Sequence, residues 1–106
     1  MTGRYEIRLL PSAARQLKKL PIAVQGPMID VIDRLADQPR PDGAKLLSGL
    51  GGGERIWRIR VGGHRILYQA QDARLVVLVV RVADRREVYD PTALKGLLKQ
   101  IRGPRS

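Results

Sequence analysis

The chain has 106 residues, enough for one domain with a single hydrophobic core. Twenty lysines and arginines against ten acidic residues give a formal net charge of +10. Such an excess on a short chain favours a nucleic acid or another anionic partner, although a general abundance of arginine would also produce it. With no cysteine, disulfides and thiolate zinc sites are excluded, and with a single histidine we expect no metal and no cofactor.

Targeting and membrane segments are not expected. The N-terminal residues 1–6 include no apolar segment of the kind found in a signal peptide. The longest apolar run, Leu75–Val80, is far too short to cross a bilayer. The sequence therefore predicts a cytoplasmic protein that does not associate with membranes.

The N-terminal part predicts one strand and a helical hairpin. The strand covers Arg4–Leu10 and is stopped by Pro11, after which Ser12 is expected to cap a helix. The apolar residues of this helix follow helical spacing at Ala13, Leu17 and Leu20.

A second apolar stripe marks the next helix, with members Val24, Met28, Ile32 and Leu35. Pro21 ends the first helix, and two starts are open for the second. It begins either with Pro21 as its first residue or near Pro27, which interrupts its first turns. The turn-forming residues Asp37–Gly43 end it.

The segment Ala44–Glu54 is expected to be a mobile connector. Its Gly51–Gly53 run resembles a phosphate-binding loop only superficially. No Lys-Ser/Thr pair follows the glycines, and the next predicted element is a strand instead of a helix, so a Walker-type loop is not expected.

Three strands are predicted next, at Arg55–Val61, His64–Gln69 and Arg74–Val82. Gly62 and Gly63 form a two-residue turn between the first two. The third contains the continuous apolar run, which is typical of a central strand covered on both faces.

Strand alternation in the first of these three strands separates apolar from basic residues. It directs Trp57, Ile59 and Val61 to one face, and Arg58 and Arg60 to the other. We interpret Trp57 and Tyr68 as core residues, not as platforms for stacking on bases. The arginine-bearing face is suited to binding phosphate groups. We therefore expect a nucleic acid as the partner.

A final amphipathic helix is predicted after Asp90-Pro91-Thr92, and residues 101–106 are expected to form a disordered tail. The apolar stripe of this helix consists of Leu94, Leu97, Leu98 and Ile101. The sequence thus predicts a single α+β domain over residues 1–106. It consists of a short N-terminal strand, a helical hairpin packed on an antiparallel sheet of about four strands, and a C-terminal helix.

The residues give no support for catalysis by a metal, a Ser-His-Asp triad or a carboxylate pair. Arginines can instead align and neutralise one phosphate while RNA is cleaved by its own 2′-hydroxyl. Arginine is a poor general base, which leaves Tyr89 and His64 as the evident groups to carry a proton. No acid close in sequence orients His64, and a structural role as a polar residue flanking the turn is favoured over a catalytic one.

Five stretches together resemble toxins of the RelE/ParE superfamily, over roughly Tyr5–Leu98. These stretches are Tyr5–Ile7, Ala14–Pro21, Pro39–Gly49, Ile56–Tyr68 and Asp84–Tyr89. Similarity to the RelE branch implies a metal-independent endoribonuclease that enters the ribosomal A site and cuts messenger RNA. It also implies an acidic, RelB-like antitoxin as the cognate partner.

The resemblance also implies roles for individual residues. Arg58 and Arg60 match basic residues that bind the phosphate region. Arg65 matches an arginine that stabilises the transition state, and Arg85 matches a second arginine that contacts the phosphate. Tyr89 matches a tyrosine that stacks on or activates the scissile nucleotide. The expected catalytic residues are Arg60, Arg65, Arg85 and Tyr89. The expected RNA-binding residues are Lys45, Arg55, Arg58, His64 and Arg86.

Arg58 and Arg60 stand where the best-known branch has lysines, so a lysine general base is absent. For silencing, we expect an acidic antitoxin segment to cover the arginines and dock in place of the last helix. The expected antitoxin-binding residues are Leu94, Leu97, Leu98 and Ile101.

Structural explanations remain open for the same residues. The basic strand face could simply be solvated, Arg65 could pair with Glu54 or Asp84, and Tyr89 could belong to the core. Two other functions also remain open: a ParE-like toxin that inhibits DNA gyrase without chemistry, and a non-toxic RNA-binding remnant. A short helical hairpin and the presence of the arginines and tyrosine favour the nuclease.

Overall fold

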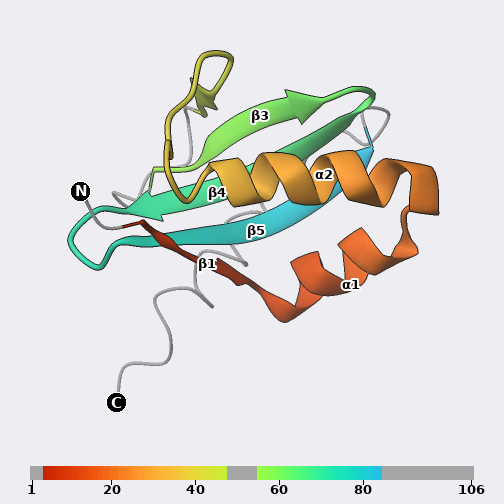
Figure 1. Ribbon diagram of the computed structural model, residues 1–106, viewed down its shortest axis with the longest axis horizontal. Helices are drawn as coiled ribbons and strands as arrows, with labels where there is room; N and C mark the ends of the chain where they lie inside the picture. Colours follow the sequence, from red (N-terminus) through yellow and green to blue (C-terminus); the bar gives the residue numbers. More distant parts are fainter. Residues whose placement is uncertain (1–3, 48–54, 85–106) are drawn as a thin grey trace.

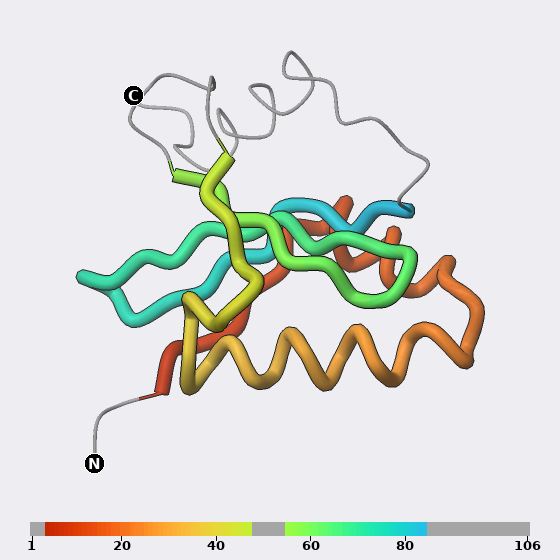
Figure 2. Tube along the Cα trace, turned by 90° about the horizontal axis from the view of Figure 1, so that it is seen from above, coloured from red at the N-terminus to blue at the C-terminus, as the bar shows by residue number. Residues whose placement is uncertain are grey.

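The computed structural model describes residues 4–47 and 55–84, in which two helices pack against a five-stranded sheet (Figure 1). The elements are β1 (Glu6–Leu9), α1 (Pro11–Lys19), α2 (Ile22–Arg34), β2 (Lys45–Leu46), β3 (Trp57–Val61), β4 (His64–Gln71) and β5 (Val76–Asp84). Seen edge-on, α2 runs along the sheet as a separate layer (Figure 2). The α+β class and the helical hairpin are as predicted. The predicted C-terminal helix and the tail lie outside the described residues.

The sheet differs from the prediction in two ways. Its strand order is β1-β5-β4-β3-β2, and β1 runs parallel to β5, so the sheet is mixed and not purely antiparallel. The partner of β1 is the strand farthest from it in sequence, which no local pattern can specify. The second difference is β2, whose Lys45 and Leu46 pair with Arg58 and Trp57 inside the segment expected to be a connector. Two residues are too few to show the alternation by which a strand is recognised.

Helix α1 begins one residue before the predicted cap. Leu10 is its N-cap, without a side-chain cap hydrogen bond, and Pro11 is the first helical residue. Proline fits this position because its fixed φ suits the helix and no N–H is needed there. Ser12 lies inside the helix, where its hydroxyl is buried without a hydrogen-bond partner among the described residues. The prediction that Ser12 caps the helix was therefore wrong.

Helix α2 begins at Ile22, with Pro21 as its N-cap, and continues through Pro27. Of the two starts left open, the one near Pro27 was wrong. Pro27 removes the N–H that would bond the carbonyl of Ala23, one turn earlier. A proline ring also clashes with the Cβ of the residue before it when that residue is helical. Here the preceding residue is Gly26, which has no Cβ, so this clash does not occur. Tertiary packing of the apolar stripe then suffices to keep the helix continuous.

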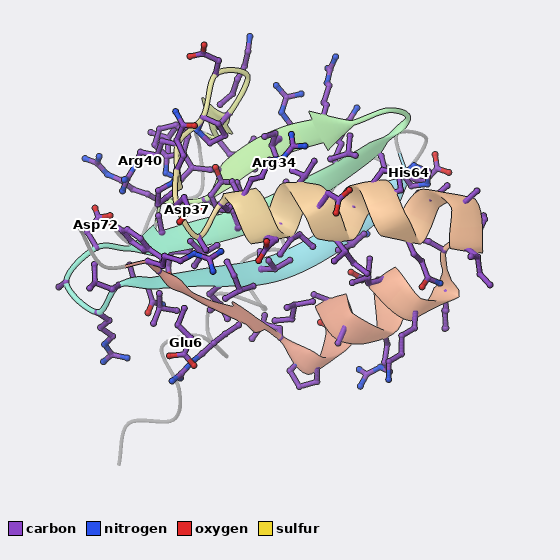
Figure 3. All side chains as sticks on the ribbon, viewed as in Figure 1. Glu6, Arg34, Asp37, Arg40, His64 and Asp72 are labelled. Atoms are coloured by element: carbon purple, nitrogen blue, oxygen red, sulfur yellow. The ribbon has the colours of Figure 1, made fainter. Side chains whose placement is uncertain are left out.

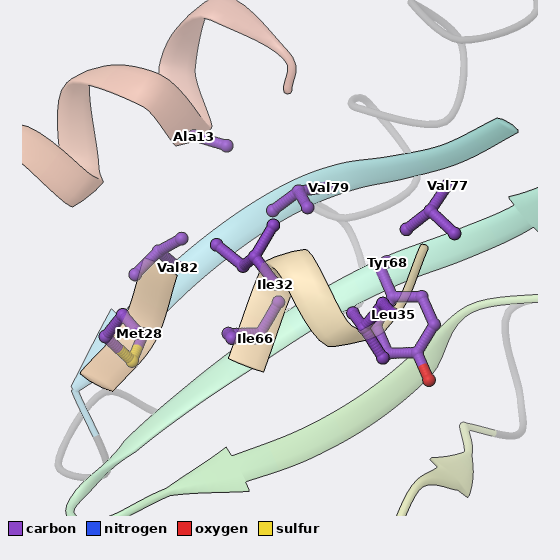
Figure 4. Close-up of a cluster of buried hydrophobic side chains, with 9 residues drawn as sticks. All are labelled: Ala13, Met28, Ile32, Leu35, Ile66, Tyr68, Val77, Val79 and Val82. Atoms are coloured by element: carbon purple, nitrogen blue, oxygen red, sulfur yellow. The ribbon is translucent and has the colours of Figure 1, made fainter. Parts of the chain in front are cut away.

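The main core lies between the helices and the sheet (Figure 4). Its buried members are Ala13, Met28, Ile32, Leu35, Ile66, Tyr68, Val77, Val79 and Val82. The Tyr68 hydroxyl donates a hydrogen bond of 2.6 Å to the Pro39 carbonyl, and burial raises the pKa of Tyr68 to about 12. Trp57 is partly buried against the same core. Both aromatic residues are thus core residues, as predicted.

Strand β5 is covered on both faces, as its apolar run predicts. Val77 and Val79 belong to the main core, whereas Val80 joins a second buried cluster with Ile56 and Leu67. The strand starts later than predicted because Leu75 has a φ of 55° and belongs to the preceding turn. Among the described residues, no helix is long and apolar enough to span a membrane.

Candidate nucleic-acid interface

The β3–β4 hairpin fixes the geometry of the candidate site. Val61 and His64 are cross-strand neighbours on either side of the predicted two-residue turn. Gly62 has a φ of 58°, a conformation that glycine adopts without steric cost. This turn places Arg60 directly opposite Arg65.

Four cations share the face of the sheet that points away from the helices. Trp57, Ile59 and Val61 pack against the main core, so Arg58 and Arg60 point to the opposite side, as predicted. Directly opposed residues of antiparallel strands project to the same face. Lys45 lies opposite Arg58, and Arg65 opposite Arg60, so both join them. We call Lys45, Arg58, Arg60 and Arg65 the basic face.

The basic face has no ion-pair partner among the residues that the structure describes. None of the ion pairs within residues 4–47 and 55–84 involves any of its four residues. The Nε atom of Arg65 is buried and has no hydrogen-bond partner in the described part of the chain. A buried donor without a partner is costly, and an anion bound beside Arg65 would supply one.

Other arginines of the described chain have acidic partners. Arg4 Nε lies 2.9 Å from Asp37 Oδ1, and Arg40 Nη2 lies 2.7 Å from Asp72 Oδ2 (Figure 3). Asp72 also accepts a 2.7 Å hydrogen bond from the Tyr5 hydroxyl. The hydrogen bond from Arg40 is the main cause that lowers the pKa of Asp72, with a second contribution from Tyr5. Among the described residues, these carboxylates pair with cations that lie outside the basic face.

Two hollows adjoin the basic face, and Arg60 lines both. One has a volume of about 220 Å³ and is lined by Arg60, Gly62, His64 and Arg65. The other, about 330 Å³, is lined by the cations Lys45, Arg58 and Arg60 and also by the acidic residue Asp42. Each is several times larger than the ~30 Å³ that one water occupies in the liquid, so a phosphate group fits beside the guanidinium groups.

His64 has an acidic neighbour that its sequence surroundings did not reveal. Asp84 is its cross-strand neighbour on β5, and His64 Nε2 lies 4.0 Å from Asp84 Oδ2. Alternation sends His64 to the other side of the sheet from Arg65, but at the strand end it lines the same hollow. The acid beside His64 is thus distant in sequence and is supplied by strand pairing, so the absence of an acid close in sequence did not exclude it. The suggested pairing of Arg65 with Asp84 is not found among the described residues, and Arg65 lies opposite Ala83 instead.

The remaining predicted site residues are Arg55 and seven residues outside the described part of the chain. Arg55 is exposed and precedes β3 without belonging to a strand. The predicted residues outside the described part of the chain are Arg85, Arg86, Tyr89, Leu94, Leu97, Leu98 and Ile101. One further cation, Arg81, was not predicted and lies directly opposite Leu67 on β5.

The arrangement can bind and neutralise phosphate but contains no base of its own. Arginine presents a planar fork of donors that matches phosphate oxygens, and it stays protonated at any physiological pH. A proton-transfer step at this face would therefore depend on a neighbouring group such as His64.

The family model for the "ParE toxin of type II toxin-antitoxin system, parDE" matches residues 7–89. A putative RelE-like toxin protein of Escherichia coli is 30% identical over 89 residues, covering 82% of this chain and 92% of that protein. Toxin RelG of Mycobacterium tuberculosis is 29% identical over 86 residues, covering 80% of this chain and 95% of its own length.

Solved structures agree with these sequence relationships. The toxin in the RelBE2 toxin–antitoxin complex of Mycobacterium tuberculosis is 28% identical, with a TM-score of 0.67 over 77% of this chain and 99% of that chain. The archaeal RelE–RelB complex of Pyrococcus horikoshii gives a TM-score of 0.69 at 22% identity, over 80% and 99% of the two chains, and shows the shared fold. The chain belongs to the ParE toxin family within the RelE/ParE superfamily and is a toxin of a type II toxin–antitoxin system.

Proposed function

We propose that this toxin is a metal-independent, ribosome-associated mRNA endoribonuclease that stops translation in the cytoplasm. The observation that supports this most is the pairing of Arg60 with Arg65. The two residues are direct cross-strand neighbours, neither has an acidic partner in the described chain, and the Arg65 Nε is buried without an acceptor. Like charges in this position destabilise a sheet, so the arrangement favours an anionic ligand that offsets the repulsion.

The proposed reaction is internal attack by RNA on itself. The 2′-oxygen attacks the adjacent phosphorus in line, and the P–O5′ bond breaks as the P–O2′ bond forms. The products are a cyclic phosphate on one fragment and a 5′-hydroxyl on the other. Arg60 and Arg65 would stabilise the charge that builds on the phosphate oxygens. The 2′-hydroxyl loses a proton and the 5′-oxygen gains one, for which Tyr89 and His64 are the candidate carriers.

Lys45 and Arg58 are proposed to hold the flanking phosphates, since they line the hollow beside Arg60. Arg55 and Arg86 stay predicted RNA contacts, and Arg85 a predicted second contact to the reacting phosphate. Tyr89 keeps its predicted role of stacking on, or activating, the scissile nucleotide.

We further propose an acidic, RelB-like antitoxin as the partner that silences the toxin. Support comes from the charge of +10 and from the relatives solved as toxin–antitoxin complexes. Electrostatic attraction would make the association fast and sensitive to salt. Docking over Leu94, Leu97, Leu98 and Ile101 stays a prediction from the sequence.

The nuclease is tested with purified toxin and ribosomes programmed with a defined messenger RNA, read by primer extension. The parent protein should cut within the A-site codon. Arg65→Ala should lower the single-turnover rate by about 10²–10³, the usual cost of removing one preorganised donor to a developing anion. Arg15→Ala is the matched control, because Arg15 is an exposed arginine on α1 that is not part of the basic face. Full activity of a folded Arg65→Ala variant would refute the assignment.

Inhibition of DNA gyrase is the alternative, and the ParE name of the matching family model favours testing it. A supercoiling assay with the same protein distinguishes the two. Intact messenger RNA together with loss of supercoiling would replace the nuclease proposal. Absence of both effects would favour a non-toxic RNA-binding protein.

A further inference from the structure

Strand β5 contains an irregularity beside the basic face. Along β4, Leu67 lies opposite Arg81, and the next residue, Tyr68, lies opposite Val79. Val80 is therefore an extra residue on β5, as in a β-bulge. Val79 and Val82 both pack into the main core, although they are three positions apart. In a regular strand, residues three positions apart would lie on opposite faces.

This bulge decides which side of the sheet Arg81 occupies. In a regular strand, Arg81 would follow the alternation of Val79 and project into the apolar core, where an uncompensated charge is very costly. The extra residue shifts the alternation, so that Arg81 lies opposite Leu67. Leu67 in turn lies opposite Arg58, and Arg58 opposite Lys45. Arg81 thus lies on the same side of the sheet as the basic face, with the buried Leu67 between it and Arg58.

A side chain from α1 holds the backbone immediately after Arg81. Strand β1 ends at Leu9, opposite Val79, so the later part of β5 has no described strand on that edge. Gln16 takes the place of a strand there, because its side-chain carbonyl accepts a 2.9 Å hydrogen bond from the Val82 N–H. This N–H belongs to the peptide unit that joins Arg81 to Val82. Fixing that unit fixes the direction in which Arg81 leaves the backbone.

We propose that Arg81 is a further RNA-phosphate-binding residue of this toxin and that Gln16 is the positioning residue that aims it. The inference rests on the proposed function, since it assigns these residues to the same RNA site. The single-turnover cleavage assay measures that function separately.

The experiment measures binding of a short single-stranded oligoribonucleotide to the full chain by fluorescence anisotropy, over a range of salt concentrations. Arg81→Gln should weaken binding about tenfold, as expected for one lost charge-assisted hydrogen bond. It should also reduce the slope of log K against log salt by about 0.7, the value for one phosphate contact on a single strand. Arg15→Gln is the matched control, since it removes the same charge next to Gln16 in the sequence and should leave the slope unchanged.

Variants of Gln16 test the positioning role without changing a cation. Gln16→Met keeps the length and removes the acceptor, so it should weaken RNA binding of the folded protein in the same direction. Thermal unfolding verifies that each variant is folded, and Gln16→Asn, which shortens the side chain by one carbon, replaces Gln16→Met if that variant does not fold. A purely structural Gln16 would change the melting temperature and leave the RNA affinity of the folded protein intact.

A double-mutant cycle links the two residues. If Gln16 acts through Arg81, combining Gln16→Met with Arg81→Gln should weaken binding no more than Arg81→Gln alone. Combining Gln16→Met with Lys45→Gln should multiply the two separate effects. Parental affinity in Arg81→Gln would overturn the inference, and independent effects of Gln16 and Arg81 would overturn the positioning role.

Failure of the inference is distinguishable from failure of the proposed function. A parent protein that neither binds nor cuts RNA contradicts the function itself. If the parent protein cuts RNA in an Arg65-dependent way but Arg81→Gln binds RNA with parental affinity, only the inference is contradicted.

Discussion

The repulsion between Arg60 and Arg65 predicts that the basic face lowers the stability of the free toxin. The two residues are directly opposed, so their guanidinium groups are on the order of 6 Å apart, given cross-strand Cα separations of ~4.5–5.5 Å. At that distance two unit charges repel by about 0.7 kcal/mol in water. Arg60→Gln should therefore stabilise the free protein by about 0.7 kcal/mol at low salt, while it weakens RNA binding.

The measurement is thermal unfolding at several salt concentrations. A gain of about 0.7 kcal/mol corresponds to a rise in Tm of roughly 3–5 °C for a domain of this size. At ~0.15 M salt the Debye length is about 8 Å, so the gain should fall to roughly half, and at ~1 M it should vanish. Arg15→Gln controls for the loss of one positive charge far from the pair. A lower Tm for Arg60→Gln at low salt, or a gain that persists at ~1 M salt, would refute the reasoning.

Three further predictions concern single positions. Tyr68 has a folded-state pKa of about 12 against an ordinary 10.0, so its neutral form is favoured in the fold, and stability should fall by roughly 2–3 kcal/mol between those pH values. Tyr68→Phe should lack this alkaline loss in unfolding experiments. Gly62→Val should lower the free energy of unfolding by more than about 1 kcal/mol, because its φ of 58° strains a β-branched residue, whereas Gly62→Asn should cost less. The lowered pKa of Asp72 contributes stability above its ordinary pKa of 3.8 and loses it as pH falls below that value, so parent and Asp72→Asn stability should converge in acid.

Features with a local period could be read from the sequence. The alternation in β3 placed Arg58 and Arg60 opposite the core, and two adjacent glycines fixed the hairpin turn. The continuous apolar run identified β5 as a strand covered on both faces. Each of these depends on neighbouring residues along the chain, because side-chain direction and turn geometry repeat over a few positions.

Features that depend on distant partners required the tertiary structure. The parallel pairing of β1 with β5 joins segments about 70 residues apart, whose orientation is set by the path of the helical hairpin between them. The sequence left the start of α2 open, because packing decides whether the helix continues through Pro27.

The candidate site shows the same division. Sequence alternation identified Arg58 and Arg60, and the resemblance assigned a role to Arg65. All three residues belong to one hairpin with a short turn, so they are close together in the sequence. The bulge at Val80 was not visible in an unbroken apolar run, yet it brings Arg81 to the same face and sets Asp84 opposite His64. A strand's alternation is determined by its own residues, but the position of an extra residue is determined by the strands and helix packed beside it. The local sequence thus determined which residues form the hairpin, and the packing of β5 against β4 and α1 decided which distant residues accompany them.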